Sequence, residues 1–180
     1  MKVKPVILCG GEGTRLFLDS KKNPSKQFID FGGWTLFGKT LDRIKDPIFD
    51  SPIISTNKTY EKLVRVTLKK KKIKKFKILL EPLKKNTAPA IISSTLISDI
   101  KTNQPVLFLP ADHHLPQKDK FNKILKSNLS KLTNNNIFIF GIKPKYPSSD
   151  YGYLLSKKIN KIMGVLFIIF FLFHKDNLNI

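Results

Sequence analysis

Short apolar runs alternate along most of the chain with stretches in which apolar residues recur at helical spacing. The runs end at glycine, proline or polar residues, which is typical of buried strands entering loops. The expected strands are Val3–Cys9, Pro52–Thr56, Phe76–Leu80, Val106–Leu109 and Ile137–Ile142, with a further one beginning within Tyr151–Leu155. The expected helices are Leu36–Ile44, Thr59–Lys72, Ala88–Leu96 and Phe121–Leu132.

Two of these helices carry apolar positions that we expect to face the core. They are Leu63 and Val66 on the second helix, with Leu68 as a further candidate, and Ala88, Ile91, Ile92, Thr95 and Leu96 on the third. Asn86 is expected to cap the third helix, whose first turn tolerates Pro89.

The alternation of strand and helix predicts an α/β fold, with a mainly parallel sheet and helices on both faces. Ligands bind such sheets at the carboxyl ends of the strands. The unusual residues of the chain lie at these ends: Gly10–Arg15 follows the first expected strand, Glu81–Thr87 the third and Ala111–His114 the fourth. This edge of the sheet is therefore the expected site.

The composition fits one folded domain. The chain has 180 residues, and 41% of them are hydrophobic, which argues against disorder. Its single cysteine, Cys9, excludes an intramolecular disulfide and a cysteine-based zinc cluster, so a reducing, cytoplasmic setting is expected. The apolar run before Gly10 is too short for the core of a signal peptide.

The net charge of +20 raises the question of a nucleic-acid partner. However, lysine, asparagine, isoleucine and phenylalanine are all abundant, and their codons are AT-rich, so coding bias offers a simpler explanation. The cluster Lys69–Lys75 is interpreted as the solvated end of a helix, because it holds no aromatic residue among its lysines. Nucleic acid is therefore not an expected partner.

The segment Gly10–Arg15 reads Gly-Gly-Glu-Gly-Thr-Arg. It lacks the Gly-Lys-Ser/Thr of a Walker loop, and Leu16 stands where a dinucleotide-binding fingerprint has its third glycine. Three glycines still let backbone amides approach phosphate oxygens, and Arg15 adds a planar set of donors. The alternative is a tight turn with a solvated arginine.

Two further side chains could act on a phosphate. The ammonium group of Lys26 can neutralise developing charge, although one lysine among so many is not distinctive. Asp112 follows a strand end, where a carboxylate can hold Mg²⁺, or alternatively cap a helix. His113 and His114 are interpreted as neighbours of the metal, because Mg²⁺ prefers oxygen ligands. Cys9 is interpreted as a small buried hydrophobe.

Five segments resemble, in the same order along the chain, motifs of the nucleotide-sugar pyrophosphorylase family. Some of these motifs are typical of the whole family, and one is typical of a single branch. Lys26-Gln27-Phe28 resembles the family's lysine motif, whereas Glu81–Ile91 resembles the mannose-1-phosphate guanylyltransferase branch and is the most specific. The other three are Leu8–Leu16, Leu109–His113, and Gly141–Pro144 with Tyr151-Gly152-Tyr153. The resemblance covers residues 3 to about 156 and implies a Rossmann-like nucleotide-diphospho-sugar transferase fold, C-terminally truncated.

The resemblance also implies a reaction, in which mannose 1-phosphate attacks the α-phosphorus of GTP to give GDP-mannose and pyrophosphate. Arg15, Lys26 and Asp112 would be catalytic, with Asp112 binding the Mg²⁺ cofactor and Gly152 lying near the mannose. The residues that it assigns to the nucleotide are Gly10, Gly11, Gly13, Thr14, Arg15, Asn86 and Thr87. No covalent intermediate is needed, so positioning and electrostatics carry the catalysis.

The chain departs from the family pattern in a few places. Ser25 stands where the family has proline, and Asp150 where it has glycine. Residues 1–161 are expected to form the nucleotidyltransferase domain, and 162–180 an atypical apolar tail, either out of frame or a buried edge strand. The nine apolar residues Val165–Phe173 are too few to span a bilayer, so no membrane contact is expected.

The later part of the family pattern, with its sugar-binding glutamate and second metal-binding aspartate, is not present. We therefore expect this chain alone to turn over slowly or not at all. The alternative is a non-catalytic nucleotide-binding remnant or subunit that needs a partner. Exposed apolar surface on the tail would favour aggregation or a homo-oligomer.

Overall fold

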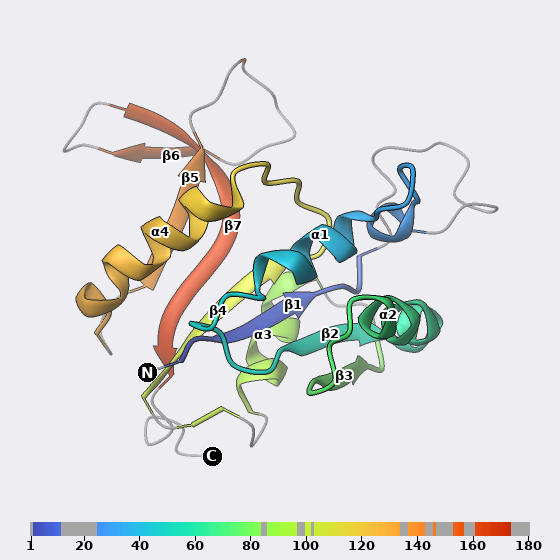
Figure 1. Cartoon of the computed structure of the whole chain (residues 1–180). Coiled ribbons are helices and arrows are strands. Elements are labelled where there is room, and N and C mark those ends of the chain that lie inside the picture. Colours follow the sequence, from blue (N-terminus) through green and yellow to red (C-terminus); the bar gives the residue numbers. More distant parts are fainter. Residues whose placement is uncertain are drawn as a thin grey trace.

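The computed structural model describes residues 2–11, 25–83, 86–96, 100–101, 103–133, 137–142, 146, 153–156 and 161–173. These residues form one seven-stranded sheet in the order β3-β2-β1-β4-β7-β5, with β6 paired to β7 (Figure 1). The strands are β1 (Lys4–Leu8), β2 (Ile53–Asn57), β3 (Lys77–Glu81), β4 (Gln104–Pro110), β5 (Ile137–Ile142), β6 (Tyr153–Ser156) and β7 (Lys161–Phe173). Each of the strands expected up to residue 142 is present.

The sheet is mainly parallel, as expected. β1 pairs in parallel with β2 and β4, and β2 pairs in parallel with β3. β7 runs antiparallel to β4, β5 and β6. β5 therefore points in the same direction as β1 to β4, and within the described residues β7 is the strand that runs against the others.

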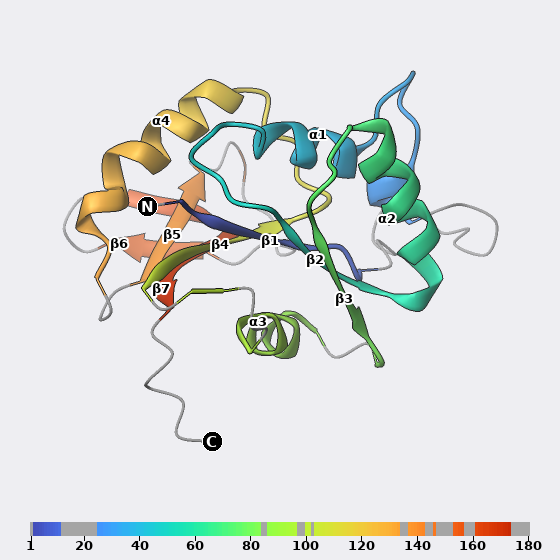
Figure 2. The same cartoon turned by 60° about the horizontal axis from the view of Figure 1, so that its bottom comes forward.

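The helices cover both faces of the sheet, which confirms the expected architecture. They are α1 (Leu36–Arg43), α2 (Lys58–Lys70), α3 (Thr87–Thr95) and α4 (Lys118–Asn128), with short 3₁₀ turns η1 (Lys26–Phe28) and η2 (Leu129–Lys131). α1, α2 and α4 lie on one face and α3 lies on the other (Figure 2). Within the described ranges, no helix is both long and apolar enough to cross a membrane.

The central strands are buried on both faces, which explains why they read as continuous apolar runs. Ile7, Leu107 and Leu109 join the cluster beneath α1, α2 and α4. Their neighbours in sequence, Val6 and Phe108, point to a second cluster, against which Ile91 of α3 is packed. Successive side chains thus alternate between the two layers of core.

The expected core face of α2 was wrong in part, because of its three expected residues only the further candidate, Leu68, is buried. Val64 and Leu68 are fully buried, whereas Leu63 and Val66 are 38% and 45% exposed. The lysine-rich C-terminal end of α2 is exposed, as expected. The N-terminal end is capped by Asn57, whose side chain accepts a bond from the amide of Tyr60.

The expected face of α3 was also wrong in part. The helix buries the small residues Ala90 and Ser94, while Ile92 and Leu96 remain 59% and 54% exposed. Ser94 can be buried because its hydroxyl donates to the carbonyl of Ala90 at 2.6 Å. Asn86 occupies the N-cap position with φ 52°, but its side chain makes no capping bond.

The apolar segment near the end of the chain forms β7, which has hydrogen-bonded neighbours on both sides (Figure 1). It is therefore an interior strand of the sheet and not the edge strand considered from the sequence. A continuous apolar run without alternation is the pattern of such a strand. The interpretation of 162–180 as an out-of-frame segment stays a prediction.

Candidate functional site

The carboxyl ends of β1 to β4 lie along one edge of the sheet, because these strands are parallel. The Gly10-Gly11 turn leaves β1, Glu81 is the last residue of β3, and Asp112 follows β4. Residues distant in sequence therefore meet where ligands of α/β sheets bind.

The β2 strand supports one side of the glycine turn. The hydroxyl of Thr56 donates to the carbonyl of Cys9 at 3.1 Å, and the amide of the Asn57 side chain donates to the carbonyl of Gly10 at 3.3 Å. Both donors are buried. The path of the backbone out of β1 is therefore set by side chains of the neighbouring strand.

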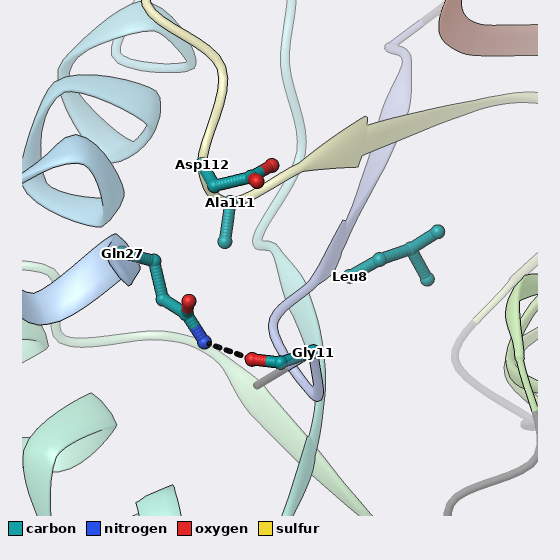
Figure 3. Close-up of a pocket in the computed structure, with 5 residues that line it drawn as sticks. All are labelled: Leu8, Gly11, Gln27, Ala111 and Asp112. Carbon is teal, nitrogen blue, oxygen red and sulfur yellow. Dashed lines mark hydrogen bonds between the residues drawn. The ribbon is translucent and has the colours of Figure 1, made fainter. Parts of the chain in front are cut away.

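The η1 turn supports the other side. The side-chain amide of Gln27 donates to the carbonyl of Gly11 at 3.0 Å (Figure 3). The hydroxyl of Ser25 lies 2.8 Å from the same oxygen. Ser25 is the residue that stands where the family pattern has proline, and here its hydroxyl contacts the turn. Gln27 directly follows Lys26 in the expected lysine motif, but it was not among the site residues predicted from the sequence.

Lys26 and Asp112 are brought together at this site. The ammonium nitrogen of Lys26 lies 3.5 Å from Oδ2 of Asp112, and both side chains are partly exposed. A small pocket at the carboxyl ends of β1 and β4 lies beside this pair (Figure 3). It is lined by Leu8, Gly11, Gln27, Ala111 and Asp112.

Glu81 closes the site on the β3 side and was not among the site residues predicted from the sequence. Its carboxylate accepts a bond from the buried hydroxyl of Ser55 at 2.6 Å. A Cβ atom on Gly10 would lie 3.3 Å from Oε1 of Glu81, so a side chain at Gly10 would crowd this carboxylate. Its position directly after an apolar run and before Pro82 was the available signal.

Burial shifts the pKa values of His113 and Cys9, which lie beside Asp112 and the glycine turn, toward their neutral forms. Burial lowers the pKa of His113, against the opposing effect of the nearby Asp112 carboxylate. Burial, and then the charge of Asp112, raises the pKa of the Cys9 thiol above its ordinary range. Cys9 is 1% exposed, so it is the inert, buried hydrophobe expected from the sequence.

The chemistry of Asp112 fits a divalent cation that is shared with a ligand. Its carboxylate supplies hard oxygen donors and is 38% exposed beside the pocket. Among the described residues, no group of three or more potential metal-ligating side chains is present. Mg²⁺ is commonly held by one or two carboxylates together with water and phosphate oxygens, so a single aspartate is a sufficient protein anchor.

The structure thus gathers Gly10, Gly11, Lys26 and Asp112 of the expected site. Asn86 and Thr87 are exposed at the start of α3 and do not line the pocket. The remaining expected residues, Gly13, Thr14, Arg15 and Gly152, lie outside the described residues.

The fold and the site define an α/β domain that brings a lysine and an aspartate together beside a glycine turn. Residues 4–164 match the model of the family described as nucleotidyl transferase, and the chain belongs to this family. It is therefore a member of a family of enzymes that transfer nucleotidyl groups.

Three relatives show what the chain is similar to within this family. The chain is 32% identical over 157 residues to a mannose-1-phosphate guanylyltransferase of Sinorhizobium fredii, with 85% of this chain and 31% of the relative covered. It is 35% identical to one of Escherichia coli, covering 86% and 34%. The alginate biosynthesis protein AlgA of Pseudomonas fluorescens is 34% identical, covering 84% and 32%. The chain therefore spans about a third of the length of these relatives.

Solved structures agree on the fold. A structure described as mannose-1-phosphate geranyltransferase from Thermus thermophilus matches with a TM-score of 0.76 and 22% identity, covering 96% of this chain and 58% of that one. HddC from Yersinia pseudotuberculosis, complexed with GMP-PN, matches with a TM-score of 0.69 and 16% identity, covering 94% and 76%. At these identities the likeness supports the Rossmann-like fold alone.

Proposed function

We propose that the site transfers a guanylyl group from GTP to mannose 1-phosphate, giving GDP-mannose and pyrophosphate. The observation that carries this proposal is the meeting of Lys26 and Asp112 beside the Gly10-Gly11 turn. The names of the relatives support the choice of substrates. The same proposal makes Gly10, Gly11, Gly13, Thr14 and Arg15 the triphosphate site, and Gly152 part of the mannose site.

Lys26 and Asp112 have complementary roles in this proposal. The ammonium group of Lys26 stabilises negative charge on the phosphate at which transfer occurs. Asp112 holds a Mg²⁺ ion, which would supply charge neutralisation for the triphosphate when bound. The two side chains lie 3.5 Å apart and partly neutralise each other. A cation held by Asp112 and a phosphate beside Lys26 would each supply an alternative partner of opposite charge.

We further propose that the carboxylate of Glu81 recognises the guanine base by accepting hydrogen bonds from it. Asn86 and Thr87 would lie close to the guanine or the ribose. A carboxylate accepts hydrogen bonds only, and guanine offers two adjacent donors on one edge, its N1–H and its amino group. Uracil and thymine present one donor between two carbonyl oxygens, and adenine presents one amino donor beside an acceptor nitrogen. Because Ser55 holds Oε1 of Glu81, the carboxylate is already oriented at the edge of the site.

The first expected result concerns nucleotide binding. GTP with Mg²⁺ should raise the melting temperature of the chain by about 5 °C or more at ~100-fold excess over its Kd. UTP, dTTP and ATP should give much smaller shifts. Thermal melts with each nucleotide test this, and Arg15→Ala serves as a variant that should lose the shift. Equal shifts with all four nucleotides would refute the choice of base, and no shift with any of them would refute the proposed function.

The second expected result separates base choice from phosphate binding. Glu81→Gln keeps the size of the side chain but turns one acceptor into a donor. The preference for GTP over UTP should therefore fall by about 10- to 100-fold, because a donor of guanine is left without its acceptor. Competition binding measures the ratio of the two Kd values. Glu61→Gln is the matched control, because Glu61 lies on α2 and pairs with Arg65. An unchanged ratio in Glu81→Gln would remove Glu81 from base recognition.

A further inference from the structure

Arg43 is a buried cation beneath the candidate metal site. Its side chain is 2% exposed, and it lies at the C-terminal end of α1 with its guanidinium over the ring of Phe121 at 5.8 Å. Among the described residues, no carboxylate forms an ion pair with it. Burying a guanidinium without a counter-charge is unfavourable, and an apolar side chain of similar size would stabilise the core more.

The bonds of Arg43 and Thr40 explain why polar groups lie at this position. Nη2 of Arg43 donates to the carbonyl of His113 at 3.1 Å, and the hydroxyl of Thr40 donates to the carbonyl of Ala111 at 3.5 Å. These carbonyls belong to the residues immediately before and after Asp112. Thr40 and Arg43 are three positions apart on α1, so they lie on the same face of the helix.

A further contact to this loop is aromatic. The ring of His114 lies 5.8 Å from that of Trp34, and Trp34 in turn stacks on Phe31 at 5.0 Å. The loop that carries Asp112 is therefore in contact with α1 and with the segment that leads into α1. The carboxylate of Asp112 points to the pocket, which Ala111 also lines (Figure 3).

We propose that Arg43, with Thr40, is a positioning residue that holds the Asp112 loop in the conformation that binds a divalent cation together with GTP. This inference rests on the proposed function, because it assigns the cation to Asp112. Residues that orient a metal ligand typically contribute 10- to 100-fold to metal affinity. Arg43 touches neither substrate nor metal in this role, and acts through the backbone on each side of Asp112.

The test compares Arg43→Met with Arg43→Lys in the full chain, using Mn²⁺ as the probe. Mn²⁺ binding in the presence of GTP is followed by electron paramagnetic resonance, and metal-free GTP binding by calorimetry. We expect Arg43→Met to stay folded and to lose about tenfold or more in Mn²⁺ affinity, with metal-free GTP affinity unchanged. Arg43→Lys, which keeps a cationic donor, should recover part of the loss.

The outcomes distinguish failure of the positioning role of Arg43 from failure of the proposed function. If the parent chain binds Mn²⁺ and GTP but Arg43→Met binds them equally well, the positioning role is wrong and the proposed function stands. If the parent chain binds neither, both are wrong. Should Arg43→Met fail to fold, Thr40→Val decides instead, because it removes one loop bond while keeping the volume. Thr40→Val should then weaken Mn²⁺ binding severalfold, and an unchanged affinity would overturn the inference.

Discussion

Asp112→Asn should abolish the dependence of GTP binding on Mg²⁺. The asparagine keeps the size of the side chain and removes the charge that the cation needs, while Lys26 remains at the site. GTP affinity with Mg²⁺ should fall to the value measured in EDTA. Any guanylyl transfer should fall by roughly 10²- to 10³-fold, the range found when one preorganised electrostatic partner is removed. Calorimetric titrations of GTP with Mg²⁺ and with EDTA measure the first effect, and pyrophosphate release the second.

The matched control is Asp119→Asn, which makes the same change in net charge at an exposed position of α4. It should leave the effect of Mg²⁺ on GTP binding unchanged. The assignment of the cation to Asp112 would be wrong if Asp112→Asn retained the full strengthening of GTP binding by Mg²⁺.

Phe37→Ala should have the largest effect on stability. Phe37 is fully buried on α1, and its ring lies 5.7 Å from that of Phe28, in an edge-on arrangement. Removing a buried phenylalanine typically lowers the free energy of unfolding by about 3–5 kcal/mol, because a cavity remains. For a chain of this size that corresponds to a melting temperature lower by on the order of 10 °C. Urea unfolding measures the loss directly.

The same substitution should also weaken nucleotide binding, because Phe28 is the last residue of the η1 turn that begins with Lys26. Phe31→Ala is the control of equal chemistry. Phe31 is 44% exposed and stacks on Trp34, so its loss should lower the free energy of unfolding by about 1 kcal/mol or less. Equal losses for Phe37→Ala and Phe31→Ala would contradict the packing described around η1.

The order of strands and helices could be predicted from the sequence because the central strands are buried on both faces. Strands such as β1 and β4 therefore read as continuous apolar runs ended by Gly10 or Pro110. The orientation of two helices could not be predicted in the same way. α3 has apolar residues around much of its circumference, and contact with the sheet is made by Ala90 and Ser94, whose small side chains allow close approach. The spacing of apolar residues indicates a helix, but it does not indicate how closely that helix packs against the sheet.

The candidate site was predictable only as a set of separate motifs. Lys26 could not be distinguished from the other lysines until folding placed it 3.5 Å from Asp112, a residue 86 positions later in the chain. Arg43 carries no local signal of its role, and the position of Glu81 between an apolar run and Pro82 marks a strand end without indicating a ligand. Glu81 belongs to the site because β3 ends beside Gly10. Arg43 belongs to it because its side chain, on α1, bonds to the loop that follows β4.

The amino-acid sequence by itself determined the α/β architecture, the family and the edge of the sheet that carries the site. These properties follow from local information, namely apolar period, strand-ending residues and short motifs. Only the tertiary structure decided that the last apolar segment lies inside the sheet, that Val64 and not Leu63 faces the core, and which charged residues meet. The reason is physical: strand pairing and side-chain contacts depend on segments far apart in the chain, and their free energy is gained only when the whole sheet has formed.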